Sequence, residues 1–321
     1  MFRKFAFALL ALTILLAACS PAATPSPLPP SAPATQLPTS PAPAPITLTD
    51  GLGRTVTLKS PAQRVVSLTP ATTEILFAVG AGSQVIGRDM FSDYPAEAQS
   101  VSDIGGSWGE YNLEAIVALQ PDLVLAGGIN PPELVASLEG LGLTVYFLPN
   151  PATLEELYAN LETVGSLTGH EAEAAALVGS LQARVAAVDE KIMPLSYAPT
   201  VYYELDATNP TKPFTAGPGT FVDLLIARAG GINIGSALSG QWAEISLEEL
   251  VVQNPAIIIL GDSAYGETPE KVAARPGWES LAAVQNGQIF PFDDNLVSRP
   301  GPRLVDGLEA LAKLLHPDLF K

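Results

Sequence analysis

The sequence predicts an α/β protein with two lobes, each built on a parallel sheet, joined by one long helix. One stretch occurs twice without a gap, as residues 106–128 (GSWGEYNLEAIVALQPDLVLAGG) and residues 240–262 (GQWAEISLEELVVQNPAIIILGD). The copies lie too far apart for a solenoid, which indicates two similar lobes. Apolar, strand-like runs alternate with helical segments along the chain, a pattern typical of parallel sheets covered by helices. Residues 169–193 carry apolar side chains at helical spacing, which predicts one helix of about six turns between the copies.

Each copy of the repeat predicts the same helix–strand unit. Asn112 and Ser246 are expected N-cap residues, whose side chains accept hydrogen bonds from the free amides of a helix's first turn. A proline ends each helix, and a short apolar run that finishes in glycine then predicts a buried strand. Each lobe therefore presents a tryptophan, Trp108 or Trp242, shortly before a helix.

Composition excludes several classes of protein. A chain of 321 residues has room for two domains with separate cores. Its 33 acidic and 16 basic residues give a formal charge of −17, so no nucleic-acid partner is expected, because phosphate binding needs a basic face. Two histidines and one cysteine leave little material for a metal site and none for a disulfide framework. We therefore expect no metal and no resident cofactor.

Residues 1–19 are interpreted as a lipoprotein signal peptide. Two basic residues precede an apolar run that is too short to span a bilayer comfortably. The run ends in Leu16-Ala17-Ala18-Cys19, which resembles a bacterial lipobox; the alternative is an ordinary signal peptide with a buried cysteine. The resemblance implies acyl chains on Cys19 that anchor the protein at the extracytoplasmic face of the cell membrane.

The rest of the chain divides into four predicted parts. Residues 20–45 are rich in proline and carry no charge, so they are expected to form a disordered tether. An N-terminal lobe is expected over residues 46–168, a connecting helix over residues 169–193 and a C-terminal lobe over residues 194–321.

Several motifs place residues 46–321 near a known family. They are Arg64-Val-Val-Ser-Leu-Thr-Pro with Glu74, Phe91-Ser-Asp-Tyr-Pro, Asn112-Leu-Glu, Gln120-Pro-Asp-Leu-Val and Ser298-Arg-Pro-Gly-Pro-Arg. These motifs resemble those of bacterial ABC-importer substrate-binding proteins, in the helical-strut subgroup that carries cobalamin, haem or ferric siderophores. The resemblance implies two Rossmann-like lobes with ligand in the cleft between them. It also implies a monomer that binds without turnover and works with an ABC permease and its ATPase subunits.

Four residues are candidates for ligand binding. Trp108 and Trp242 could hold a large flat ligand between two indoles, or they could be symmetric core residues. The resemblance puts Phe91 where cobalamin binders have an aromatic contact, and Arg299 where they have a cleft arginine. An arginine would suit haem propionates or a siderophore equally well. Because Phe91 and Arg299 both stand where the resemblance places contacts of cobalamin binders, cobalamin is the favoured ligand, and ferric siderophores and haem are alternatives.

Two further details of the sequence concern the choice among cobalamin, ferric siderophores and haem. The acidic neighbour that the resemblance implies beside Arg299 falls among residues 293–295 (Asp-Asp-Asn). Both histidines are expected at helix ends, away from the cleft, so haem would need Tyr94 or Tyr111 as its iron ligand.

Glu114 and Glu248 match the two glutamates that dock on permease arginines in the family. A pseudo-symmetric pair suits a partner with two-fold symmetry. The alternative is structural, because an acid in a helix's first turn is stabilised by the helix dipole by about 0.3–1 kcal/mol.

Two other classes of function remain as alternatives. A two-lobe α/β enzyme is disfavoured because the expected cleft offers no Ser/His/Asp set, no thiol nucleophile and no clustered metal ligands. A surface-anchored interaction module would suit the tether, but it would not explain paired aromatic residues in the cleft.

Overall fold

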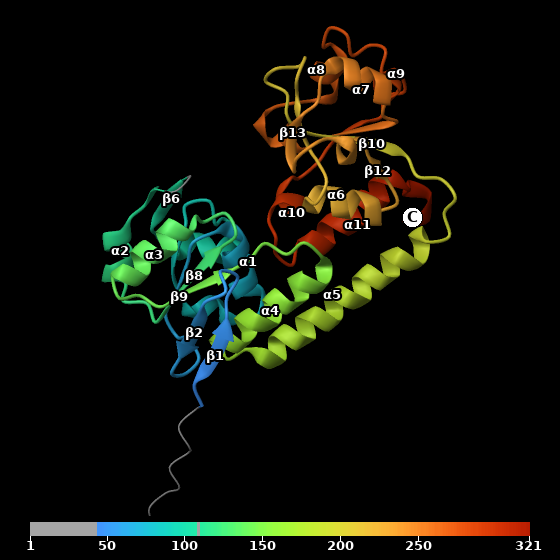
Figure 1. Cartoon of the computed structure of the whole chain (residues 1–321). Coiled ribbons are helices and arrows are strands. Elements are labelled where there is room, and N and C mark those ends of the chain that lie inside the picture. The colour runs from blue at the N-terminus through green and yellow to red at the C-terminus, as the bar shows by residue number, and fades with distance from the viewer. Residues whose placement is uncertain (1–43, 108–109) are drawn as a thin grey trace, which may run out of the picture. The chain divides into compact units, whose positions relative to one another are not determined.

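The computed structural model describes residues 44–107 and 110–321, which pack into one unit (Figure 1). The predicted signal peptide, the predicted lipidation site Cys19 and nearly all of the predicted tether lie outside the described residues. In the part of the chain that is described, no helix is both long enough and apolar enough to cross a membrane.

The first lobe opens with an antiparallel hairpin, β1 (Ile46–Thr49) and β2 (Thr55–Leu58). A five-stranded sheet follows in the order β5-β4-β3-β8-β9, and every neighbouring pair in it is parallel, as predicted. Its strands are β3 (Val65–Ser67), β4 (Val85–Arg88), β5 (Ser102–Asp103), β8 (Leu123–Gly127) and β9 (Val145–Leu148). The lobe's helices are α1 (Pro70–Ala78), α2 (Leu113–Ala118), α3 (Pro132–Gly140) and α4 (Leu154–Thr168). All five residues of β8 are buried, as in a strand covered on both faces.

The predicted long helix is α5 (Glu171–Ile192), with 22 residues. It packs against α4, which precedes it, and against α11 (Leu304–Leu315) near the end of the chain (Figure 1). Its buried side chains recur every three to four residues: Ala174, Val178, Leu181, Val185 and Val188. These side chains belong to a core that also holds residues of both sheets. The helix is therefore fixed by packing to segments on either side of it in the chain.

The second sheet has the order β13-β11-β10-β14-β15, with β12 also paired to β10. Its strands are β10 (Thr200–Asp206), β11 (Phe214–Ala216), β12 (Ile232–Asn233), β13 (Trp242–Glu244), β14 (Ile257–Leu260) and β15 (Ile289–Pro291). The centre is parallel, but β11 and β13 are antiparallel to their neighbours, so the prediction of a parallel sheet is wrong at this edge. The remaining helices are α6 (Phe221–Arg228), α7 (Leu247–Gln253), α8 (Pro269–Ala273), α9 (Ala282–Gln285) and α10 (Asn295–Ser298).

The two repeat copies share backbone conformations as well as sequence. Gly106 and Gly240 both have φ of 103°, a region that side chains other than glycine rarely adopt. Gln120 and Asn254, each just before a proline, have φ of 48° and 43°. In the first copy, β6 (Gly105–Ser107) and β7 (Glu110–Tyr111) pair antiparallel on either side of the two residues outside the description. The repeat is therefore structural, as predicted.

Candidate ligand-binding site

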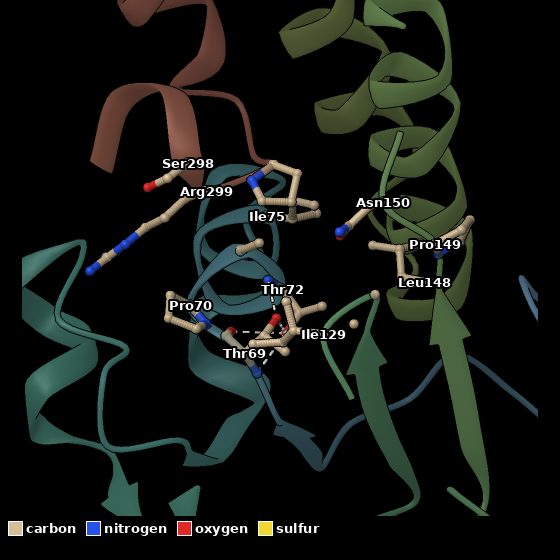
Figure 2. Close-up of a pocket in the computed structure, with 14 residues that line it drawn as sticks. Thr69, Pro70, Thr72, Ile75, Ile129, Leu148, Pro149, Asn150, Ser298 and Arg299 are labelled. Carbon is tan, nitrogen blue, oxygen red and sulfur yellow. Dashed lines mark hydrogen bonds between the residues drawn. The ribbon is translucent and has the colours of Figure 1, made fainter. Parts of the chain in front are cut away.

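A cavity of about 130 Å³ opens at the carboxyl ends of β3, β8 and β9. Ligands of open α/β sheets bind at this edge. The lining also includes residues 298–300, at the end of α10, which come after α5 in the chain. Figure 2 shows its main lining residues: Thr69, Pro70, Thr72, Ile75, Ile129, Leu148, Pro149, Asn150, Ser298 and Arg299. Small-molecule pockets usually measure about 300–1,000 Å³, so this cavity would hold one part of a large ligand.

The start of α1 forms the floor of the cavity. Thr69 is its N-cap, and the Thr69 hydroxyl accepts a hydrogen bond from the Thr72 amide at 3.2 Å. The Thr72 hydroxyl in turn accepts from the Thr69 amide at 3.2 Å, and Pro70 begins the helix with a preset φ. The Thr72 hydroxyl also lies 2.7 Å from the Ser67 hydroxyl. These hydrogen bonds fix the start of α1, and they engage the hydroxyl groups of Thr69, Thr72 and Ser67 with partners within the protein.

Arg299 lines the cavity, as its predicted role requires, but its charge is already paired. Its Nη1 lies 2.6 Å from Asp93 Oδ1 and 3.2 Å from Glu74 Oε1. Figure 2 shows its side chain extending away from Leu148 and Asn150. The guanidinium group therefore faces two carboxylates of the first lobe.

The ion pairs of Arg299 involve Glu74 and Asp93 and no acid among residues 293–295. Asp294 accepts a hydrogen bond from the Tyr203 hydroxyl at 2.8 Å, and Asp293 accepts from the backbone and side-chain amides of Asn295. The acids that pair with Arg299 come from more than 200 positions earlier in the chain.

Glu74 on α1 pairs with two arginines that follow α5 in the chain, Arg299 and Arg303. It is only 2% exposed and also accepts hydrogen bonds from Arg303, from Nε at 2.8 Å and from Nη2 at 2.5 Å. Burial alone would lower the pKa of Arg303, but the hydrogen bonds and charge of Glu74 raise it. The Arg303 guanidinium also lies 4.0 Å from the centre of the Tyr94 ring, which is nearly half exposed.

Phe91 is nearly half exposed at the tip of a loop that a buried carboxylate holds in place. Asp89 accepts a hydrogen bond from the Phe91 amide at 2.9 Å and another from the Ser92 hydroxyl. Burial raises the pKa of Asp89 in spite of these bonds. The loop thus presents the Phe91 ring from a fixed backbone.

The three tryptophans have different surroundings. Trp242, in β13, is 53% exposed, which excludes the core interpretation for this residue. Trp278 is fully buried, and its Nε1 donates to the carbonyl oxygen of Pro210 at 3.0 Å, so it packs the core. Trp108 lies outside the described residues. Of the predicted ligand residues within the description, only Arg299 lines the cavity of Figure 2.

Tyr111 has its hydroxyl occupied. The hydroxyl donates to the carbonyl oxygen of Leu68 at 2.6 Å and accepts from Asn130 Nδ2 at 2.8 Å. Burial raises the pKa of Tyr111 to about 12. Of the two tyrosines named for haem, only Tyr94 is therefore open to a ligand.

Glu114 and Glu248 are both exposed, in the first turns of α2 and α7. The predicted caps Asn112 and Ser246 are confirmed, since each side chain accepts a hydrogen bond from the amide three residues on, at 2.9 and 3.1 Å. The two glutamates thus occupy equivalent positions on equivalent helices.

Comparison with known proteins identifies the family. Residues 65–296 match the periplasmic binding protein family. The chain belongs to this family. The ABC transporter substrate-binding lipoprotein YvrC of Bacillus subtilis is 30% identical over 280 residues, which are 86% of this chain and 87% of the relative. A cobalamin-binding protein of Halobacterium salinarum is 31% identical over 279 residues, which are 85% of this chain and 74% of that relative.

Among solved structures, the periplasmic heme-binding protein RhuT of Roseiflexus sp. RS-1 matches with a TM-score of 0.72 and 26% identity, covering 80% of this chain and 99% of RhuT. The family and these relatives confirm the predictions of a two-lobed α/β fold and of a binding protein. The family is extracytoplasmic.

In this periplasmic binding protein, the sequence analysis missed the pairing of Glu74 with Arg303. Both residues stand in the quoted motifs, but no partner was assigned to either. One signal could have pointed to Glu74, because it is the only charged residue in the otherwise uncharged helix α1. A lone acid within an apolar helix is rarely buried unless a cation pairs with it.

Proposed function

We propose that this chain is the substrate-binding lipoprotein of an ABC importer and that it captures a corrinoid, cobalamin first, between its lobes. It then delivers the ligand to a permease driven by ATPase subunits. The relatives named as an ABC substrate-binding lipoprotein and as a cobalamin-binding protein support this role and this ligand.

The observation that carries the ligand choice is the pairing of Arg299, which lines the cavity, and of Arg303, which shares Glu74 with it. Arg299 is paired with Asp93 and Glu74, and Arg303 with Glu74. A ligand that binds through carboxylates would have to displace these acids. Cobalamin presents neutral amides around a large ring, and the exposed rings of Phe91 and Trp242 offer it apolar area and stacking.

Equilibrium dialysis of the purified chain against cyanocobalamin, haemin and ferrichrome tests the ligand. We expect saturable one-to-one binding of cyanocobalamin, weakened about tenfold by Trp242→Ala. Tyr197→Ala, which removes another exposed aromatic ring, is the matched control and should bind normally. Saturation by haemin or ferrichrome but not by cyanocobalamin would overturn the ligand choice and keep the transport role.

Haem is the second candidate, and exposed Tyr94 is the observation that favours it. Its hydroxyl belongs to an exposed side chain beside Arg303, and a heme-binding protein has the same fold. If haem is the ligand, Tyr94→Phe should abolish the absorption bands of a tyrosinate-ligated iron. Unchanged bands in that variant would exclude this ligation.

We propose that Glu114 and Glu248 dock on the permease. One turn beyond them, Val117 and Val251 are equivalent in the repeat and each 39% exposed. Each lobe thus offers an acid followed by an apolar contact, which suits two related permease subunits. Glu114→Lys with Glu248→Lys should abolish uptake into vesicles that contain the permease while leaving ligand binding intact. Glu133→Lys, which changes an exposed residue in the first turn of α3, is the control.

We also propose that Cys19 is acylated and that the anchored protein is a monomer. Cells fed labelled palmitate should label the wild-type chain but not Cys19→Ser. Sedimentation of the Cys19→Ser protein should give the mass of one chain; a dimer would contradict the monomer proposal.

A further inference from the structure

A second cavity lies in the C-terminal lobe, where the parallel strands β10 and β14 end. It measures about 370 Å³ and lies between the segment that follows β10 and the segment that follows β14. Its polar lining residues are Asp206, Thr208, Asp262, Tyr265 and Glu267. This acidic pocket shares no residue with the cavity of Figure 2.

The acidic pocket holds more negative charge than its surroundings neutralise. Arg275 donates to Glu204 at 2.6 and 2.8 Å and to Glu267 at 2.8 Å. Lys271 is mostly exposed and only approaches Glu267, at 4.0 Å. Arg275 is engaged by Glu204 and Glu267, and within the described parts of the chain Asp262 forms no ion pair.

Asp262 is the unusual member of the pocket. It is 5% exposed, and its Oδ1 has no hydrogen-bond partner within the described parts of the chain. A buried carboxylate oxygen without a donor is costly, because water and protein partners are both missing. The pocket therefore lacks one hydrogen-bond donor, and a positively charged donor would suit it best.

The kind of cation follows from the geometry. In residues 44–107 and 110–321, no group of three or more His, Cys, Asp or Glu side chains could hold a metal ion. An ammonium group needs fewer convergent ligands, because it brings its own N–H donors. The ring of Tyr265, 91% exposed, stands at the pocket and can cover a cation.

We propose that the acidic pocket binds the ammonium group of an organic amine and that Asp262 Oδ1 accepts a hydrogen bond from it. This proposal goes beyond the corrinoid role and does not depend on it. The ammonium group belongs to a small amine, because the amides of the proposed corrinoid ligand are neutral.

Binding of an amine is coupled to a proton. Burial, together with the charges of Glu204 and Glu267, raises the pKa of Asp262 to about 7. An ammonium group stabilises the ionised carboxylate, so it binds with release of a proton below neutral pH and more tightly above it. The charged and titratable groups around Asp262 are Tyr202, Tyr203 and Glu204 within β10, Asp206 at the end of β10, and Glu267 and Arg275 after β14.

Calorimetric titration of the full chain with 1,5-diaminopentane tests the proposal, with 1,5-pentanediol as the uncharged control. We expect the diamine to saturate one site and the diol to give no binding. Affinity should rise about tenfold from pH 6 to pH 8, because the ionised fraction of a group with a pKa of about 7 rises by that factor.

Three variants locate the site. Asp262→Asn keeps the shape of the side chain and should weaken binding about tenfold and remove its pH dependence. Tyr265→Ala changes a side chain on the surface, so it should fold normally and bind a few-fold more weakly. Glu133→Gln removes the same charge from a distant helix and should bind like the wild type. Equal diamine binding by wild type and Asp262→Asn, equal binding of the diol, or no diamine binding at all would overturn the proposal.

Cyanocobalamin separates this proposal from the proposed function. If the chain binds the diamine but not cyanocobalamin, only the corrinoid role is refuted. If it binds cyanocobalamin but not the diamine, only the amine site is refuted. If cyanocobalamin displaces the diamine, the acidic pocket belongs to the cleft that holds the transported ligand. If both bind together, a separate small amine is the occupant.

Discussion

Removing the Glu74 carboxylate should destabilise the protein more than the removal of a similar exposed ion pair. Glu74 is 2% exposed and accepts three hydrogen bonds, two from Arg303 and one from Arg299. It lies before α5 in the chain, and both arginines lie after it. In Glu74→Ala, Arg303 loses both bonds to Glu74, while Arg299 keeps Asp93 at 2.6 Å.

The magnitude follows from the burial of the pair. Breaking a buried ion pair by removing one partner costs about 3–5 kcal/mol, because the remaining charge is left uncompensated. Since Arg299 keeps one acid and Arg303 keeps the ring of Tyr94, we expect the lower end, about 3 kcal/mol. Glu74→Gln keeps the shape and one acceptor, so it should cost about 2 kcal/mol.

The matched control is Glu309→Ala. Glu309 accepts two hydrogen bonds from Arg184, at 2.8 and 2.6 Å, but both side chains are partly exposed. An exposed pair contributes about 0–1 kcal/mol. Urea unfolding followed by circular dichroism and by fluorescence gives the free energy of unfolding, provided that the two transitions coincide. If Glu74→Ala costs no more than Glu309→Ala, burial does not strengthen the contact and the reasoning is refuted.

Two further predictions concern Asp262 and the tryptophans. The pKa of Asp262 is raised from 3.8 to about 7 in the folded protein, so the folded state holds an extra proton between those values and its stability falls as the pH rises through this window. Asp262→Asn should remove that slope and gain roughly 2 kcal/mol over the wild type at pH 8, about half the full effect of the shift, because the asparagine amide is itself a buried polar group without a partner for every atom. Unfolding free energies measured from pH 4 to pH 8 check this, and an unchanged slope would contradict it. Trp278→Ala should cost about 3–5 kcal/mol in the same assay and exposed Trp242→Ala less than about 1 kcal/mol; equal costs would contradict the difference in burial.

The parts of the fold that depend on local rules could be predicted from the sequence. N-caps at Asn112 and Ser246, the apolar runs of β8 and β14 and the spacing of α5 each involve residues close in the chain. The antiparallel edge was missed because β11 has three residues, too few for a periodic pattern, between a proline and a glycine.

Charged contacts between distant segments could not be predicted in the same way. Glu74 and Arg303 are separated by 229 positions, and nothing local to either residue names its partner. Glu204 is fully buried in β10, although a glutamate in a strand usually faces solvent; its partner Arg275 lies 71 positions later. A lone acid within an apolar segment can indicate its own burial, as at Glu74, but nothing near it in the sequence identifies the distant arginine that pairs with it.

The repeat offers a last test, because two equivalent positions should respond to glycine in opposite directions. Gln120 and Asn254 both adopt a left-handed conformation, which costs a residue other than glycine about 1–2 kcal/mol. Gln120 is exposed, so Gln120→Gly relieves this cost, loses about 0.5–1 kcal/mol to the greater freedom of the unfolded chain, and should stabilise the protein by about 0.5 kcal/mol.

Asparagine tolerates this conformation better, and Asn254 Oδ1 accepts a hydrogen bond from the Ala282 amide at 2.8 Å. Asn254→Gly loses that bond and should destabilise the protein by about 1 kcal/mol. Urea unfolding of both variants measures the difference; a shift of the same sign and size in both would show that the side chain of Asn254 adds nothing to the backbone conformation that the two copies share.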